Sequence, residues 1–415
     1  MYYWLVEKRA DNKAKAKGTK AKADLDRPDL VALCAVGAEK AVSGELKGLS
    51  LEVTESGFGK VRFRADLAGM YRALMGLRAA DRVLLEAARF RADSFDRLFS
   101  GAGAVAWEAL VPAGLGIRLD KVRCTSSALH SQTGIQSVVH KAVAERLCRR
   151  RSLSRLPEGE AAEIRVHMEK DFASILLDLS GDPLFKRGYR HEGGIAPLRE
   201  STAAALLLLS GWKRKYPLHD PFCGSGTILA EAFLYALDLA PGIGRDFAVG
   251  RLAIADPGLE EKVRAELRAK ANAERTIRIS GSDADGRALE LARANFGRLT
   301  DLAGPETRAA VPAVSVSALE KAACPFPLEP AEGKTGDPRG FIVTNPPYGK
   351  RLGDRTGARE LYRGMAGLAR NFPGWKLALI CDDPDFEGHF GRKADSCRQI
   401  LSGNSPAFFF QYGRL

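Results

Sequence analysis

Residues 217–232 read PLHDPFCGSGTILAEA, and this stretch decides the fold of the second half of the chain. The residues up to Asp220 read as a short strand, a turn with Gly224 and Gly226 follows, and apolar residues then recur at helical spacing after Thr227. The pattern predicts a strand, a tight turn and a helix. The glycines let the backbone approach a ligand closely, and the new helix points free N–H groups at it. The spacing differs from the dinucleotide motif and from the P-loop.

Further strands and helices are expected to alternate after this turn. The patterns predict strands over 276–282, 313–316, 341–344 and 375–382, a helix over 286–296, and a closing hairpin over 398–401 and 407–412. This alternation predicts an α/β fold with a doubly wound, mostly parallel sheet. Because ligands of such sheets bind outside the carboxyl ends of the strands, the turn after Asp220 is a candidate binding loop.

A second special loop follows the expected strand 341–344 and reads Asn345-Pro346-Pro347-Tyr348. The Asn345 side-chain oxygen and the Pro346 carbonyl can each accept one N–H of an exocyclic amine, and Tyr348 can stack on the ring that carries it. Pro346 and Pro347 have fixed φ angles, so the loop is set before a substrate arrives. The alternative is an ordinary turn, since Asn and Pro are common turn residues.

Two carboxylates close the expected strand 276–282. A carboxylate at the end of the second strand of such a sheet typically accepts hydrogen bonds from ribose hydroxyls. Asp283 is the favoured candidate for this role, and Asp285 is expected to cap the helix that starts at Gly286.

The first half of the chain is expected to form smaller α+β units. Strand, helix, strand, strand and helix are predicted over 30–35, 37–46, 51–55, 60–64 and 66–74, the order of a split βαβ unit. A second mixed unit is expected over residues 66–180, with strands over 82–90, 116–124, 163–170 and 174–180 and helices over 94–102 and 134–151. Residues 1–29 hold a basic, Lys/Ala-rich segment that is either a solvated tail or an RNA-contacting arm.

Composition limits the partners and the compartment. The 415 residues carry a formal net charge of +12, which fits nucleic acid best and an anionic membrane surface second. The seven cysteines form no Cys-x-x-Cys pair and the six histidines show no ligand spacing, so we expect a reducing cytoplasm, no disulfide framework and no metal. No apolar run approaches the ~20 residues of a membrane span, and the amino terminus has the reverse order of a secretory signal.

The two loops together resemble those of class I S-adenosylmethionine-dependent amino-methyltransferases. The resemblance rests on Asp220-Pro-Phe-Cys-Gly-Ser-Gly-Thr followed by Asn345-Pro-Pro-Tyr, each after an expected strand. Further runs narrow it to the bacterial ribosomal RNA (23S) guanine-N2 methyltransferase family, namely Arg187-Gly-Tyr-Arg190, Ala196-Pro-Leu-Arg-Glu200, Gly281-Ser-Asp-Ala-Asp285 and Thr344-Asn-Pro-Pro-Tyr-Gly-Lys-Arg-Leu352.

The resemblance implies a domain plan and a set of site residues. It implies a ferredoxin-like domain over 30–65, a THUMP RNA-binding domain over 66–180 and a Rossmann-like class I methyltransferase domain over 181–415. Asp283 would hold the cofactor ribose, and residues 345–348 would hold the target base. The family usually has an acidic residue after the third strand that contacts the cofactor adenine, and Ser317 stands there in this chain. The S-adenosylmethionine loop would comprise Asp220, Phe222, Cys223, Gly224, Ser225, Gly226 and Thr227.

The expected activity is methyl transfer to the N2 amine of a guanine in 23S ribosomal RNA, with naked RNA or a precursor ribosomal particle as partner. Three alternatives remain open. They are a tRNA guanine-N2 methyltransferase, a DNA adenine-N6 methyltransferase, and a non-catalytic RNA-binding protein of ribosome assembly. Cys223 is expected to pack in the core rather than to act as a nucleophile.

Overall fold

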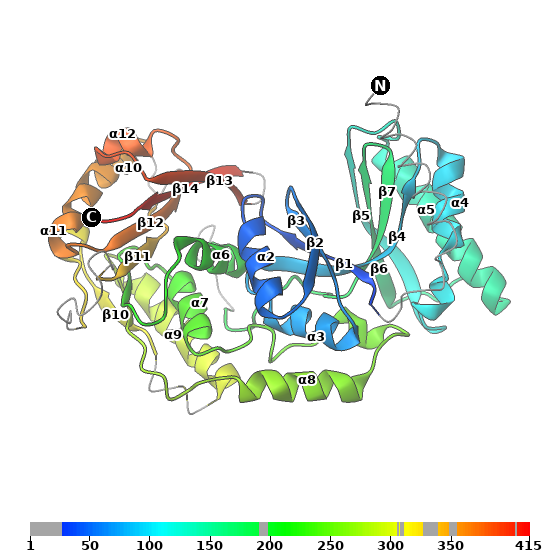
Figure 1. Cartoon of the computed structure of the whole chain (residues 1–415), viewed down its shortest axis with the longest axis horizontal. Helices are drawn as coiled ribbons and strands as arrows, with labels where there is room; N and C mark the ends of the chain where they lie inside the picture. Colours follow the sequence, from blue (N-terminus) through cyan, green and yellow to red (C-terminus); the bar gives the residue numbers. More distant parts are fainter. Residues whose placement is uncertain are drawn as a thin grey trace, which may run out of the picture.

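The computed structural model describes residues 27–190, 198–304, 307, 311–326, 339–347, 355–402 and 405–415. Two seven-stranded sheets organise them, one in each half of the chain (Figure 1). The basic segment expected over 1–29 lies almost entirely outside the described residues, and so does Tyr348.

The amino-terminal sheet has the strand order β2-β3-β1-β4-β7-β6-β5. Strand β4 pairs with β1 on one side and with β7 on the other, both antiparallel, so the sheet runs without a break through both expected units. Only β5 and β6 pair in parallel among its described strands. The strand bounds are β1 Asp29–Cys34, β2 Glu52–Gly57, β3 Lys60–Arg64, β4 Ala80–Arg91, β5 Gly116–Thr125, β6 Ala161–Glu169 and β7 Phe172–Asp178.

Four helices accompany this sheet. Helices α2 (Glu39–Gly48) and α3 (Leu67–Gly76) belong to its first part, and α4 (Phe95–Ala104) and α5 (Gln132–Arg151) pack together beside its last strands (Figure 1). Asp66 caps α3 by accepting a hydrogen bond from Gly69 N at 2.7 Å, which confirms the expected start of this helix.

The carboxyl-terminal sheet has the order β10-β9-β8-β11-β12-β14-β13. Strands β8 to β12 run parallel, and β13 and β14 add an antiparallel hairpin. This confirms the doubly wound, mostly parallel sheet. The order reverses direction between β8 and β11, and α/β proteins bind ligands at such a point. The bounds are β8 Leu218–Asp220, β9 Ile279–Asp283, β10 Ala313–Val316, β11 Phe341–Thr344, β12 Lys376–Cys381, β13 Ser396–Ser402 and β14 Ser405–Tyr412.

Helices cover both faces of this sheet, and the alternation of side chains along its central strands explains why. On β11, Phe341 and Val343 pack into a core shared with α6 (Glu200–Ser210), α7 (Thr227–Ala236) and α9 (Gly286–Ala303). Ile342 points to the opposite core, which is formed with α10 (Arg355–Gly364), α11 (Leu368–Asn371) and α12 (Phe386–Phe390). Successive strand residues face opposite sides, so a strand buried on both faces is apolar throughout.

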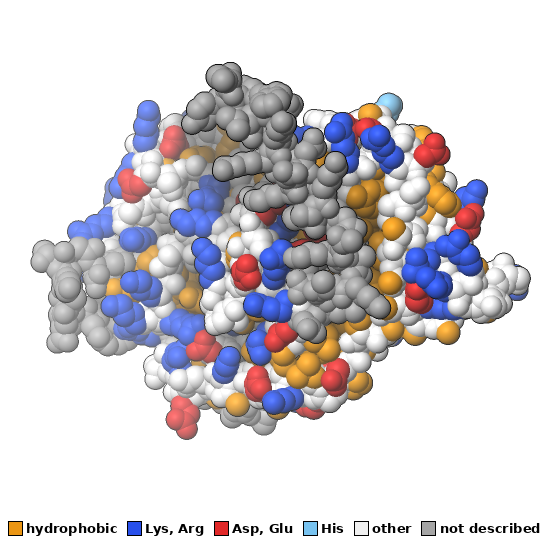
Figure 2. Space-filling model, turned by 45° about the vertical axis from the view of Figure 1, so that its right-hand side comes forward, with side chains coloured by type: hydrophobic (Ala, Val, Ile, Leu, Met, Phe, Trp, Pro, Cys, Tyr) orange, Lys and Arg blue, Asp and Glu red, His pale blue; other side chains and the backbone are white. Residues whose placement is uncertain are grey.

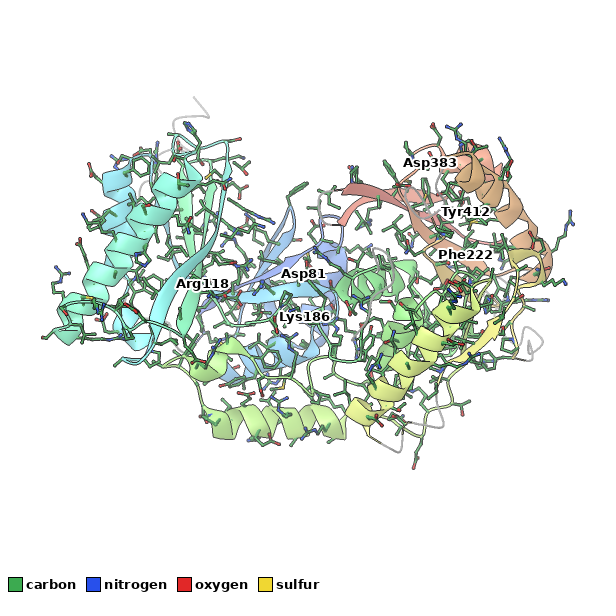
Figure 3. The ribbon with its side chains drawn as sticks, turned by 180° about the vertical axis from the view of Figure 1, so that it is seen from behind. Asp81, Arg118, Lys186, Phe222, Asp383 and Tyr412 are labelled. Carbon is green, nitrogen blue, oxygen red and sulfur yellow. The ribbon has the colours of Figure 1, made fainter. Side chains whose placement is uncertain are left out.

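The two halves share contacts beyond their covalent connection. Helix α8 (Pro257–Ala269), which is not among the elements expected from periodicity, packs on α3 of the amino-terminal half. Its Val263 and Leu267 belong to the core of that half. Asp81 and Lys186 mark the junction in Figure 3, where Leu184 N donates to Asp81 O at 2.8 Å. No helix within the described ranges is long and apolar enough to cross a membrane.

Candidate functional site

The loop between β8 and α7 has the geometry that its glycines allow. Gly224 and Gly226 have φ angles of +51° and +80°, in the left-handed region that side chains disfavour. A Cβ on Gly226 would lie 2.7 Å from Phe296 Cζ of α9, whereas a Cβ on Gly224 would meet no atom within 4 Å. Gly226 is therefore needed for packing, and Gly224 keeps open the space in front of the loop. Asn295 Nδ2 donates to Ser225 O at 2.9 Å and fixes the turn from α9.

Asp220 joins this loop to the end of β11. Its Oδ1 accepts hydrogen bonds from Phe222 N at 3.1 Å and from Thr344 Oγ1 at 2.6 Å. Both Asp220 and Thr344 are buried, with 1% and 0% of their surface exposed. Burial raises the pKa of Asp220 to about 7. The hydrogen bond from Thr344 lowers this pKa, but by less than burial raises it. Asp220 thus ties the two loops that flank the switch point of the sheet.

Asp283 ends β9 beside the same loop. Its Oδ2 accepts a hydrogen bond from Gly224 N at 2.9 Å, and its Oδ1 accepts one from Asp285 N at 2.9 Å. Each carboxylate oxygen has a second acceptor position, so a ribose hydroxyl can still donate to either. Asp285 caps α9 by accepting from Arg287 N at 2.9 Å, which confirms its expected structural role.

The end of β10 offers an apolar surface next to Asp283. Ser317 N donates to Asp283 O at 3.0 Å, and the Ser317 hydroxyl donates to Ala318 O at 3.1 Å. Val316 leaves 62% of its surface exposed there. A flat heterocycle can pack against this valine, while Ser317 offers a hydroxyl where a carboxylate was expected from related sequences.

The loop after β11 carries a buried acceptor without a partner. Asn345 follows Thr344 directly, and within the described ranges its Oδ1 is buried and accepts no hydrogen bond. An unpaired buried acceptor costs free energy, so such an atom points to a ligand that donates to it. Pro346 is buried and Pro347 half-buried beside it.

Three further residues expected in the cofactor loop, Cys223, Phe222 and Thr227, pack in a core or form a hydrogen bond near the loop. Cys223 is buried in the core, and burial raises the pKa of its thiol, which fits packing rather than nucleophilic chemistry. Phe222 is half-buried against the core on the opposite face of the sheet, in the carboxyl-terminal half seen in Figure 3. Thr227 Oγ1 accepts a hydrogen bond from Arg190 Nη1 at 3.4 Å.

Three contributors, Thr344, Arg190 and Asn295, are not among the site residues expected from the sequence. Thr344 precedes the Asn345 motif at the end of a strand, and this position is the signal that could have identified it. Arg190 gives no such signal, because its contact with Thr227 spans 37 residues. Within the described ranges no three His, Cys, Asp or Glu side chains gather as metal ligands would.

Comparison with known proteins adds independent findings. The family described as RMKL-like, methyltransferase domain, matches residues 187–407, and the RlmL ferredoxin-like domain matches residues 29–84. YpsC of Bacillus subtilis (strain 168), which carries the name of an RNA methyltransferase, is 33% identical over 92% of this chain and 95% of its own length. The ribosomal RNA large subunit methyltransferase K/L of Syntrophotalea carbinolica is 34% identical over 88% of this chain. The chain spans about half the length of that relative, 51%.

Solved structures share the fold across both halves. SMU.472, crystallised in complex with S-adenosylhomocysteine (SAH), superposes with a TM-score of 0.80 at 34% identity and covers 93% of this chain and 98% of its own. A Listeria monocytogenes protein described as a predicted N6-adenine-specific DNA methylase gives a TM-score of 0.81 at 31% identity, covering 95% and 99%. These matches confirm the ferredoxin-like and Rossmann-like parts of the expected fold. The chain therefore belongs to the RMKL-like methyltransferase family.

Proposed function

We propose that this protein transfers a methyl group from S-adenosylmethionine to the N2 amine of a guanine in 23S ribosomal RNA. One observation carries the proposal. Asn345 presents a buried, unpaired acceptor among the described residues, and the preceding Thr344 is bonded to Asp220 at the edge of the glycine loop. A group that can receive an amine N–H is thus fixed beside a loop suited to a nucleoside cofactor. The S-adenosylhomocysteine complex of SMU.472 supports this choice of cofactor.

The residues of the glycine loop would hold the cofactor. Gly224 leaves room for its close approach, and the first turn of α7 directs free N–H groups toward it. Asp283 would accept from the ribose hydroxyls, while Val316 would pack on the adenine and Ser317 would lie at its edge. The open space at Gly224 and the exposed side chain of Val316 suit a nucleoside. A phosphate chain fits less well, because the loop lacks the lysine of a P-loop.

Held by the glycine loop and Asp283, S-adenosylmethionine would supply an electrophilic methyl group, which would pass to the amine nitrogen with release of one amine proton to solvent and of S-adenosylhomocysteine. The role of the protein in this reaction would be to orient the amine. Asn345 Oδ1 and the Pro346 carbonyl would accept its two N–H groups, which aims the nitrogen lone pair at the methyl carbon. Pro347 helps to fix this geometry before the base arrives, and Tyr348 would stack on the base. A base inside a helix must leave its stack to reach such a loop.

RNA is the substrate class that the charge and the relatives favour. Lysine and arginine side chains are spread over the face shown in Figure 2, in keeping with the formal net charge of +12. Under this proposal, the ferredoxin-like domain, expected over 30–65 and matched over 29–84, precedes a THUMP RNA-binding domain that ends at residue 180 and a catalytic domain over residues 181–415. YpsC and the K/L enzymes are named for activity on RNA, and the K/L name specifies the large ribosomal subunit.

The decisive experiment compares modified nucleosides in ribosomal and transfer RNA from strains with and without the gene. Loss of N2-methylguanosine from 23S ribosomal RNA supports the proposal. Its loss from transfer RNA alone would instead identify the tRNA enzyme, and unchanged RNA in both pools would contradict the assignment.

Asn345→Ala tests the role of the amide in the purified protein. We expect methyl transfer to fall by about two orders of magnitude or more, because the amine loses an acceptor that orients it, while the Kd for S-adenosylhomocysteine changes less than about threefold. Calorimetry and a tritium-transfer assay measure the two quantities. An equal loss of binding and turnover would contradict the assigned role.

Methylation of adenine N6 in DNA is the second candidate, because the Listeria protein is described as an N6-adenine-specific DNA methylase. Adenine N6 is also an exocyclic amine that Asn345 and Pro346 could orient. The same tritium-transfer assay on duplex DNA and on ribosomal RNA separates the two candidates.

A further inference from the structure

The turn at residues 187–190 lies between the two halves and contacts both. Arg187 is buried, and its guanidinium donates to Arg78 O, in the segment after α3, and to Leu184 O. On the other side, Arg187 Nε lies 3.5 Å from Glu231 Oε1 in the middle of α7. One side chain therefore connects the amino-terminal half to the helix that begins at the glycine loop.

Glu231 is the anchor of this contact on α7. Its side chain is fully buried, at 0% exposure, and its Oε1 also accepts a hydrogen bond from the Tyr189 hydroxyl at 3.1 Å. Glu231 lies four residues after Thr227, so both face the same side of the helix. A buried carboxylate tolerates few arrangements of its partners, and Glu231 therefore fixes where α7 lies relative to the turn.

The same turn reaches the glycine loop by two further routes. Arg190 Nη1 donates to Thr227 Oγ1 at 3.4 Å and to Leu198 O at 3.0 Å. The Tyr189 carbonyl accepts from Arg298 Nε at 2.8 Å, and Arg298 Nη2 donates to Asn295 Oδ1 at 2.8 Å. Asn295 in turn holds Ser225 O. Arg187 and Tyr189 thus contact the middle of α7 and Arg190 contacts its start, while Tyr189 also reaches the glycine loop through Arg298 and Asn295.

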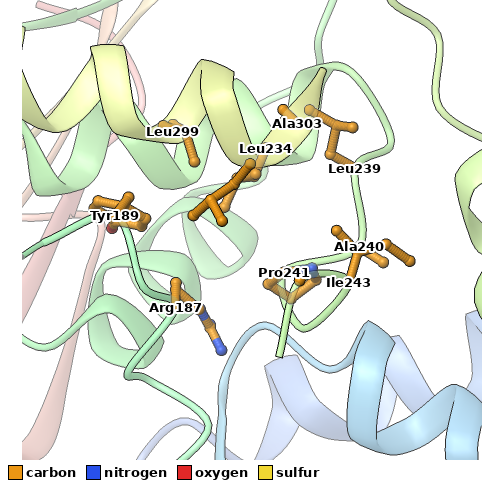
Figure 4. A pocket seen from close by; sticks show the side chains of 11 residues that line it. Arg187, Tyr189, Leu234, Leu239, Ala240, Pro241, Ile243, Leu299 and Ala303 are labelled. Atoms are coloured by element: carbon orange, nitrogen blue, oxygen red, sulfur yellow. The ribbon is translucent and has the colours of Figure 1, made fainter. Parts of the chain in front are cut away.

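The packing around the turn leaves little space to absorb a shift. The cavity bordered by Arg187, Tyr189, Leu234 and Leu299 has a volume of about 20 Å³ (Figure 4). That volume holds about one water molecule and is far too small for a nucleoside. Because no empty space can absorb a displacement of the turn, such a displacement would also shift α7.

The amino-terminal side of the turn is equally fixed. Glu45 of α2 accepts hydrogen bonds from Arg78 N at 2.8 Å and from Ala79 N at 2.9 Å. Arg78 Nη2 donates to Leu239 O, just after α7, at 2.6 Å. Two buried arginines, Arg78 and Arg187, thus bridge the amino-terminal half and the segment around α7.

We propose that the turn 187–190 positions the cofactor loop relative to the amino-terminal half, with Tyr189 and Glu231 as positioning residues. The inference rests on the proposed assignment of the loop at 220–227 to S-adenosylmethionine, and it adds that cofactor affinity depends on a hydrogen bond at the side of α7. Neither residue is given a chemical step. They hold the first turn of α7 in the orientation from which its N–H groups face the ligand.

The test measures the Kd for S-adenosylhomocysteine by calorimetry in the full-length protein. Tyr189→Phe is the main variant, because it removes one hydroxyl and keeps the ring. We expect its Kd to rise about fivefold, since a net hydrogen bond is worth about 1 kcal/mol. Glu231→Gln should raise the Kd more than about tenfold. In both variants the KM for S-adenosylmethionine should rise while kcat at saturating cofactor stays within about twofold of wild type.

Asp178→Asn is the matched control. Asp178 has a fully buried carboxylate paired with Arg82 at 2.5 Å, but it lies in the amino-terminal sheet and is not bonded to α7. We expect it to lower the melting temperature and to leave the Kd unchanged. A wild-type Kd in Tyr189→Phe, or an equal rise in Asp178→Asn, overturns the inference. Failure of the wild-type protein itself to bind S-adenosylhomocysteine overturns the cofactor assignment instead.

Discussion

Replacing Thr344 with valine removes the hydroxyl that bonds to Asp220 and keeps the shape of the side chain. The two atoms lie 2.6 Å apart and both residues are buried, so water cannot replace the lost donor. A hydrogen bond to an ionised group contributes about 1.5–3 kcal/mol, and one to a neutral group about 1 kcal/mol. The cost of Thr344→Val therefore depends on whether Asp220 carries a charge.

The pKa of Asp220, raised by burial to about 7, sets the pH at which this cost changes. Below that pH the carboxyl is protonated in the folded state, and the substitution should lower the unfolding free energy by about 1 kcal/mol. Above it the carboxylate is ionised, and the loss should grow to about 2–3 kcal/mol. Because Thr344 lowers the pKa of Asp220, the valine variant should also protonate at a higher pH than the wild-type protein.

Urea unfolding followed by tryptophan fluorescence at pH 5.5 and pH 8.5 measures both losses. Thr300→Val is the control, because Thr300 is buried and its hydroxyl donates to the Gly297 carbonyl, which does not titrate. Thr300→Val should lower the unfolding free energy by the same amount at the two pH values. A pH-independent cost for Thr344→Val, or no cost at all, would show that Asp220 does not depend on this hydrogen bond.

Three further outcomes follow from the site. Asp220→Asn keeps the acceptor oxygen but cannot titrate. Because the folded carboxyl binds its proton more tightly than the unfolded one, wild-type stability should fall relative to the variant by about 3 kcal/mol as pH rises from 4 to 7, and a constant difference in urea unfolding would contradict this. Gly226→Ala should lower the unfolding free energy by about 2–3 kcal/mol, because the added Cβ meets Phe296 and the φ angle is positive. Gly224→Ala should lower it by about 1 kcal/mol, and equal melting temperatures of the two variants would refute the distinction. Ser317→Asp places a carboxylate at the position where the family resemblance implies an acidic residue. It should lower the Kd for S-adenosylhomocysteine about fivefold in calorimetry, since an added hydrogen bond contributes about 1 kcal/mol, and an unchanged Kd would contradict a contact of residue 317 with the adenine.

Much of the fold could be predicted because local patterns determine it. The strand, turn and helix pattern of residues 217–232, with its glycines after Asp220 and its helical spacing beyond Thr227, predicted β8, the loop and α7. Side chains that cap helices, such as Asp66 and Asp285, act within three residues of their own position and leave a local signal. Helix α8 was missed although its local signals are present, because Asp256 caps it, Pro257 begins it, and Leu259, Val263 and Leu267 recur at helical spacing.

The sequence by itself predicted the strands of both sheets and showed that two candidate loops follow parallel strands, but it did not predict helices α8, α10, α11 and α12. Only the tertiary structure decided which side chains meet. Thr344 bonds to Asp220, which lies 124 residues away in the sequence, and Gly224 bonds to Asp283, which lies 59 residues away. Glu231 accepts hydrogen bonds from Arg187 and Tyr189, in the turn between the two halves. Periodicity reports the face on which a residue lies, but a hydrogen bond between distant segments depends on strand order and on the packing of helices, and neither leaves a local pattern.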